Sequence, residues 1–162
     1  MQVETGTGRP VTTPAELAAH LEQVRAHRAE LRESVAAVEL ALETPLARQG
    51  PWLERVGVAL TELAHDFGEH VALTESPGGI YDRARHTAPR LGGAVRRLLT
   101  EHRDLAAEIV RLLTVLESGA VPADLRGLRE ELTVLTGRLG RHRQAGGDLV
   151  YEAYDVDLGG SG

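Results

Sequence analysis

The segment LGGAVRRLLTEHRDLAAEIVRLLTVL (residues 91–116) carries the pattern that decides the fold. Its apolar residues recur at alternating steps of three and four, which is typical of an amphipathic helix that faces other helices. One histidine stands in this stripe where Leu or Val is expected. The stripe is Leu91, Val95, Leu98, His102, Leu105, Ile109, Leu112 and Leu116. The segment therefore predicts a helix with a histidine on its buried face.

Two other segments repeat this arrangement, and a fourth comes close to it. The second stripe is Leu53, Val56, Leu60, Leu63, Phe67 and His70. The third is Leu125, Leu128, Leu132, Leu135, Leu139, His142 and Leu149. The fourth is Leu17, Leu21, Val24, Leu31, Val35, Val38 and Leu42. Arg28 occupies the strict stripe of this fourth segment, and His27 lies on the stripe beside it.

Turn and capping residues divide the chain into four predicted helices. Thr13 is a candidate N-cap, followed by Pro14 at the first helical position and by Glu16. Turn signals then predict helices from there to about 44, over about 52–75, from about 87 to 117, and from about 122 to 154. The Gly146-Gly147 pair predicts an interruption of the last helix. Short connections between long helices predict an all-α, up-down-up-down antiparallel four-helix bundle over residues 15–154, with tails at 1–14 and 155–162.

Composition and charge exclude several classes of protein. The net charge of -6, with no basic stripe, argues against a nucleic-acid binder. The absence of cysteine excludes disulfides, thiolate metal sites and cysteine nucleophiles. No apolar run is long enough to cross a membrane, and the polar N-terminus does not resemble a signal peptide. We therefore expect a cytoplasmic protein with no membrane association.

The four histidines are predicted to lie at similar heights in the bundle. Counted from the expected turns, His27, His70, His102 and His142 agree to within about one helical turn, ~5 Å. A single buried histidine is more often structural than a ligand. Several uncoordinated histidines in one dry layer, however, would leave unpaired nitrogens at a cost of about 1–3 kcal/mol each. The pattern therefore favours a metal site or polar cluster over separate structural histidines.

The same residues resemble the hemerythrin-like (HHE cation-binding) family. The matches are His27 in AHRAEL, His70 and Glu75 in EHVALTE, His102 in EHRDL, and His142 in LGRHRQAGGDLVYEA, over about residues 15–154. The resemblance implies a four-helix bundle that holds non-haem iron, most simply two ions. It also implies a set of metal ligands. These are His27, His70, Glu75, His102, His142 and Asp148.

The carboxylate spacing departs from the family pattern. Four residues after His70 stands Thr74, and the acid follows one later at Glu75. Gly146 and Gly147 precede Asp148, so that this acid reaches the site only if the glycine pair bulges. Iron that lacks bridging carboxylates is held less well, because iron ions favour oxygen beside imidazole. A two-iron centre, a mononuclear iron or zinc site, and a site without metal therefore all remain open.

The remaining candidates are weaker. Asp66 could orient the imidazole of His70, since outer hydrogen bonds fix metal-ligating histidines. Tyr81, Tyr151 and Glu152 are further possible contributors near the bundle end. We expect Glu101, His65 and His86 to be exposed.

The expected function is binding or sensing of O₂, NO or redox state, or the handling of iron. No nucleotide-binding, esterase or zinc-protease motif occurs, and no acid–base pair or nucleophile is evident, so we expect no turnover of an organic substrate and leave enzymatic activity open. The alternative is a metal-free helical module for interaction or regulation. A homodimer or another protein partner is also left open, and the YEAYDVDLGG segment (residues 151–160) has no assigned role.

Overall fold

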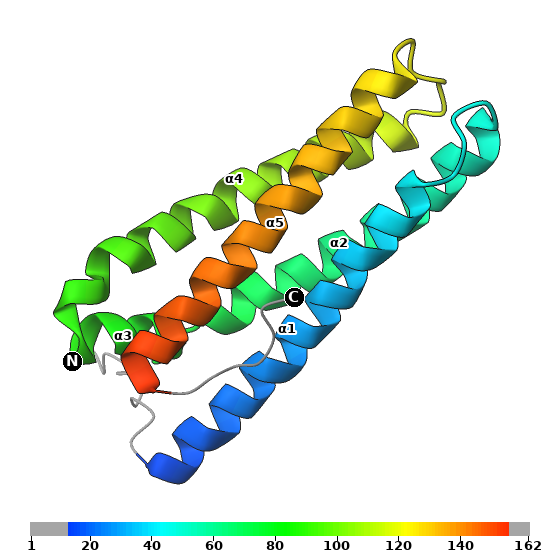
Figure 1. Ribbon diagram of the computed structural model, residues 1–162. Helices are drawn as coiled ribbons and strands as arrows, with labels where there is room; N and C mark the ends of the chain where they lie inside the picture. The colour runs from blue at the N-terminus through cyan, green and yellow to red at the C-terminus, as the bar shows by residue number, and fades with distance from the viewer. Residues whose placement is uncertain (1–12, 156–162) are drawn as a thin grey trace, which may run out of the picture.

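The computed structural model describes residues 13–155, and every regular element within that range is helical. Four long helices run side by side (Figure 1). They are α1 (Pro14–Leu42), α2 (Gln49–Thr74), α4 (Gly92–Glu117) and α5 (Leu125–Tyr154). A short helix α3 (Ile80–Thr87) and a single 3-10 turn η1 (Pro89–Leu91) connect α2 to α4. The all-α prediction is confirmed, whereas the predicted tails lie almost wholly outside the described residues.

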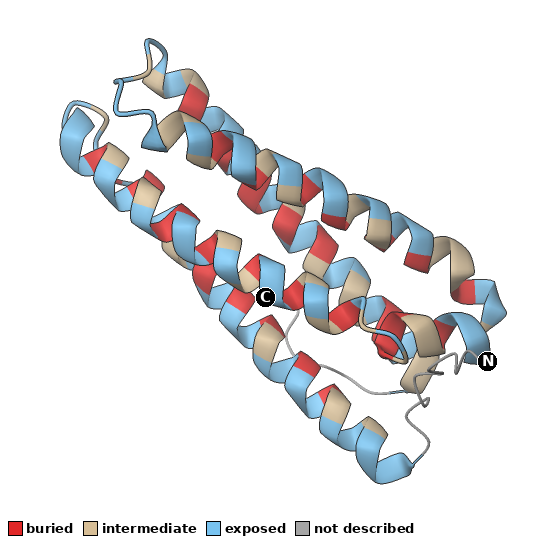
Figure 2. Ribbon diagram, turned by 180° about the vertical axis from the view of Figure 1, so that it is seen from behind, coloured by how far each residue is buried: buried red, intermediate tan, exposed pale blue. Residues whose placement is uncertain are grey.

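Each long helix packs against two others. The helix α1 contacts α2 and α5, and α4 likewise contacts α2 and α5. The buried residues recur along the inward faces of these helices, as the apolar stripes require (Figure 2). Among the described residues, no helix combines the length and the apolar character needed to cross a membrane.

The N-terminus of α1 forms as its sequence predicts. The Thr13 hydroxyl accepts the backbone N–H of Glu16, and the Glu16 carboxylate accepts the backbone N–H of Thr13, both at 3.1 Å. This reciprocal capping box satisfies two N–H groups that the first helical turn would otherwise leave unpaired. Pro14 occupies the first helical position, where no backbone donor is needed.

The helix α3 is an element that the turn signals did not predict. Gly78 has a φ of 71°, and a Cβ on Gly79 would lie 2.6 Å from the Ser76 hydroxyl, so the turn requires small residues at both positions. The Asp82 carboxylate accepts the Gly78 N–H at 3.0 Å and closes the turn. The helix then buries Ile80, Tyr81 and Ala84 against the end of the bundle. Sequence reasoning missed it because its eight residues are too few for a clear helical period.

The helix α5 corrects a second prediction. It runs without interruption from Leu125 to Tyr154, through Gly146 and Gly147. A glycine pair costs about 1 kcal/mol per residue relative to alanine in a helix, but tertiary packing often overrides that penalty. Here the pair lies where Arg28 of α1 crosses α5, and the absence of side chains provides room for its guanidinium group.

Candidate metal centre

Three histidines from three helices meet inside the molecule. His70 of α2, His102 of α4 and His142 of α5 are 5%, 1% and 2% exposed. The Nε2 atom of His70 lies 3.2 Å from Nε2 of His102 and 3.3 Å from Nε2 of His142. One ligand atom from each residue lies within 4.8 Å of the others, so the three histidines can hold a metal ion.

The histidines form part of a polar layer that separates two apolar clusters. Phe67 packs against all three rings, with ring centroids 5.9 Å from His70, 5.9 Å from His102 and 6.2 Å from His142. The Phe67 cluster extends toward the α1–α2 connection and includes Leu31, Leu60, Leu105 and Leu139. The other cluster includes Val24, Tyr81, Leu98 and Leu149. Apolar residues on both sides therefore place the imidazoles at one level.

Two glutamates hold the outer nitrogens of the cluster. Nδ1–H of His102 donates to Oε1 of Glu75 at 2.7 Å, and Nδ1–H of His142 donates to Oε2 of Glu101 at 2.6 Å. Because an ionised carboxylate can only accept, each bond places the ring proton on Nδ1 of a neutral histidine. Nε2 of both rings is then a bare lone pair that faces His70. This carboxylate–histidine arrangement is the one that orients metal-ligating imidazoles in proteins.

Burial keeps the three histidines neutral. Desolvation is the main cause that lowers the pKa of His70 well below its ordinary value, and the neighbouring His102 and His142 lower it further. Desolvation also lowers the pKa of His102 and of His142, although Glu75 and Glu101 respectively oppose that effect. Neutral imidazole is the form that binds a metal ion.

These shifts predict a pH-dependent stability of the metal-free protein. An unfolded histidine takes up a proton near pKa 6.5, whereas the buried histidines stay neutral to lower pH. Below that value the unfolded state binds more protons, so the free energy of unfolding falls as the pH falls, by up to about 1.4 kcal/mol per pH unit for each such histidine. We expect the urea midpoint to decrease between about pH 7.5 and 5.5, and to decrease less in a His70→Leu variant. A midpoint that stays constant over this range would contradict the argument.

The structure brings together only part of the predicted ligand set. His27 of α1 is half-buried and lies outside the cluster, with its Nδ1 3.4 Å from a carboxylate oxygen of Glu30. Glu75 reaches the cluster, but its carboxylate contacts the outer nitrogen of His102. Asp148 lies on the exposed face of the uninterrupted α5 and accepts the side-chain amide of Gln144 at 2.9 Å.

The weaker candidates lie in different environments. The Asp66 carboxylate accepts the Ser34 hydroxyl of α1. Glu152 pairs with Arg90 at 3.1 Å on the surface, and Tyr151 is exposed. Tyr81 is buried and stacks on His102, with ring centroids 5.7 Å apart.

Two residues of the site were not predicted. Glu101 was expected to be exposed, and it is half-exposed, yet its carboxylate accepts the Nδ1–H of His142. Its neighbour in sequence is His102, and the packing of α4 against α5 brings it to the level of His142. Arg28 is 8% exposed and lies at the level of the histidines on α1. Its place in the apolar stripe was the available signal. His65 and His86 are exposed, as predicted.

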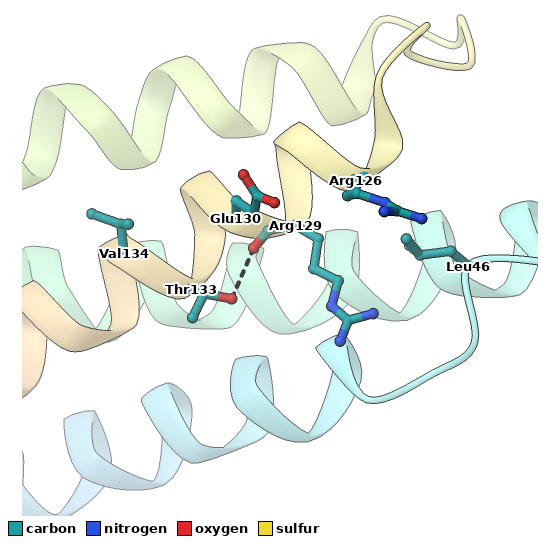
Figure 3. A pocket seen from close by; sticks show the side chains of 6 residues that line it. All are labelled: Leu46, Arg126, Arg129, Glu130, Thr133 and Val134. Carbon is teal, nitrogen blue, oxygen red and sulfur yellow. Dashed lines mark hydrogen bonds between the residues drawn. The ribbon is translucent and has the colours of Figure 1, made fainter.

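A surface pocket of about 710 Å³ lies near the other end of α5 (Figure 3). Its wall consists of Leu46 from the α1–α2 connection and residues of the first turns of α5. Those residues are Arg126, Arg129, Glu130, Thr133 and Val134. The Thr133 hydroxyl donates to the Arg129 carbonyl within the helix at 2.8 Å. None of these residues belongs to the histidine cluster, so this pocket is separate from the candidate metal centre.

Comparisons of the chain with protein-family models, with curated proteins and with solved structures find no match.

Proposed function

We propose that the chain is a hemerythrin-like metal-binding protein. In this proposal the four long helices form an up-down-up-down antiparallel bundle, and His70, His102 and His142 hold one non-haem metal ion, iron in the first place. The three imidazoles occupy part of the coordination sphere and leave an open position for a small ligand such as O₂ or NO. The biological role would be ligand or redox sensing, or the handling of iron.

The convergence of the three Nε2 atoms is the observation that carries the proposal. A metal ion bound to imidazole nitrogens at about 2.0–2.1 Å with tetrahedral angles places those nitrogens about 3.3 Å apart. The two Nε2–Nε2 distances of 3.2 and 3.3 Å match that spacing. The glutamates at Nδ1 of His102 and His142 support the same reading, because they leave Nε2 without a proton.

The arrangement of the carboxylates favours one ion over two. A two-iron centre needs carboxylates that reach the metals, since iron prefers oxygen beside imidazole. The carboxylates of Glu75 and Glu101 accept outer imidazole N–H groups instead, and Asp148 lies on the exposed face of α5. A second ion would therefore require these side chains to change partners.

The residues of the chain have separate tasks in this proposal. The histidines bind the ion, and Glu75 and Glu101 fix the orientation of two of the rings. Phe67 and the apolar clusters exclude water from one side of the site. Bound ferrous iron would supply the affinity for a diatomic ligand and the capacity for one-electron change.

The first test is the metal content of the full chain after anaerobic loading with ferrous iron, and separately with zinc. We expect one equivalent of metal per chain. At a free metal concentration about 1,000 times the dissociation constant, binding should add about 4 kcal/mol to the free energy of unfolding. For a chain of this length the melting temperature should rise by roughly 8–16 °C.

Other stoichiometries would have clear meanings. Two equivalents of iron would favour a two-iron centre over the single site. No stoichiometric binding of either metal would refute the proposal. The metal-free alternative would then stand, in which Nε2–H of His70 donates to the bare nitrogens of its two neighbours.

The two outer glutamates give a further prediction. Glu75→Gln and Glu101→Gln should each weaken metal binding about 10–100-fold, because the loss of an outer carboxylate frees the ring and lowers its basicity. Competition with a chromophoric chelator measures this change in affinity. Glu69→Gln is the matched control, since Glu69 is exposed on α2 directly before His70. Equal affinities for all three variants would mean that the glutamates do not support the site.

A further inference from the structure

The polar layer contains a fourth member, which comes from α1. On each long helix one buried polar residue separates the two apolar clusters, and on α1 that residue is Arg28, between Val24 and Leu31. The other three members are histidines from α2, α4 and α5. The wall of the site that lacks a histidine donor therefore carries a guanidinium group.

Close packing against α5 fixes the position of this guanidinium. Nη1–H of Arg28 donates to the backbone carbonyl of Arg143 at 2.7 Å, one residue after His142. A Cβ on Gly147 would lie 3.1 Å from Nη2 of Arg28. A Cβ on Gly146 would lie 4.0 Å from Nη1 of Arg28 and 3.8 Å from the Tyr81 hydroxyl. Arg28 and Tyr81 thus lie on either side of the same turn of α5, next to the histidine cluster.

The charges of the loaded site do not cancel. A divalent ion on three neutral histidines contributes two positive charges, Arg28 adds one, and Glu75 and Glu101 remove two. One positive charge remains in a largely buried site, and an uncompensated charge in such a place is costly. A monoanion at the open position of the ion would neutralise it. A guanidinium group is suited to carboxylate oxygens because its N–H groups form a planar fork.

We infer that the metal centre, if it forms as proposed above, takes a small carboxylate-class monoanion as an additional ligand, held between the ion and the Arg28 guanidinium with the Tyr81 hydroxyl beside it. The close approach of α1 and α5 at Gly147 restricts the anion to the size of formate or acetate. Burial raises the pKa of Tyr81, so its hydroxyl stays protonated and can donate a hydrogen bond to the anion.

Cobalt(II) is the probe for this inference, because its visible absorption changes with its coordination. The full chain is loaded with cobalt and titrated with acetate, and in parallel with acetamide as the neutral analogue. We expect a saturable spectral change with acetate and none with acetamide. Arg28→Gln should weaken acetate binding roughly 10–100-fold, the usual effect of a charge-assisted hydrogen bond. Arg25→Gln removes the same charge from an exposed position on α1 and should leave acetate binding unchanged.

Further variants cover the case in which Arg28→Gln does not fold. Arg28→Lys keeps the charge and should bind acetate with intermediate affinity. Gly147→Ala places a methyl group against the guanidinium and should weaken acetate binding while cobalt still loads. Circular dichroism checks the helicity of each variant.

The possible failures can be told apart. If no cobalt binds stoichiometrically, the metal centre itself is refuted and the anion site falls with it. If cobalt binds and acetate does not alter its spectrum, or if Arg28 and Gly147 variants bind acetate as the wild type does, the anion site is refuted and the metal centre stands.

Discussion

His70→Leu should abolish stoichiometric metal binding and leave the metal-free fold intact. His70 is the central member of the cluster, since its Nε2 atom lies within 3.3 Å of both other Nε2 atoms. Its loss leaves two nitrogens of a three-nitrogen site. The affinity should therefore fall by more than the roughly 10–100-fold that the loss of an outer carboxylate costs. Leucine fills a similar volume, so the metal-free protein should keep its helicity.

The thermal shift on metal addition is the clearest measurement of this loss. The wild type should gain roughly 8–16 °C at a metal concentration about 1,000 times its dissociation constant, and His70→Leu should gain nothing measurable at the same concentration. His65→Leu is the matched control, because His65 is exposed on the same helix. If His70→Leu still shows the wild-type shift, metal binds elsewhere on the chain, and the histidine cluster is a structural polar layer.

Much of the arrangement could be predicted from the spacing of apolar residues alone. The stripes of α2, α4 and α5 each place a histidine among leucines, and all three histidines are buried. The ends of α1 were also predictable, because Thr13, Pro14 and Glu16 form a capping signal whose hydrogen bonds are local in sequence. These features depend on near neighbours in the chain, which periodicity reports directly.

The outer contacts of the site could not be predicted in the same way. Glu75 and Glu101 contact histidines of other helices, so their roles depend on the rotation and height of two helices at once. Residue spacing fixes height only to about one turn, ~5 Å, whereas a hydrogen bond requires an accuracy of a few tenths of an ångström. The family resemblance suggested His27 as a ligand, but the stripe position on α1 belongs to Arg28. Periodicity was the better guide there, because burial follows the strict stripe.

Phe67→Ala should produce the largest loss of stability among single substitutions near the site. Phe67 is 2% exposed and packs against all three imidazoles. Truncating a buried phenylalanine to alanine costs about 3–5 kcal/mol, from lost burial and from the cavity that remains. The melting temperature of the metal-free protein should fall by roughly 6–20 °C. Chemical denaturation at neutral pH measures the free energy directly.

The same substitution should also weaken metal binding, by about tenfold or more, because the rings lose the wall that holds them in one orientation. Leu60→Ala separates this effect from general destabilisation. Leu60 is fully buried in the same cluster and lies about two turns before Phe67 on α2, so its truncation should cost about 2–5 kcal/mol. Measured well below both melting temperatures, metal affinity should fall in Phe67→Ala alone. An equal fall in both variants would show that the affinity follows global stability and that the Phe67 ring has no specific part in orienting the histidines.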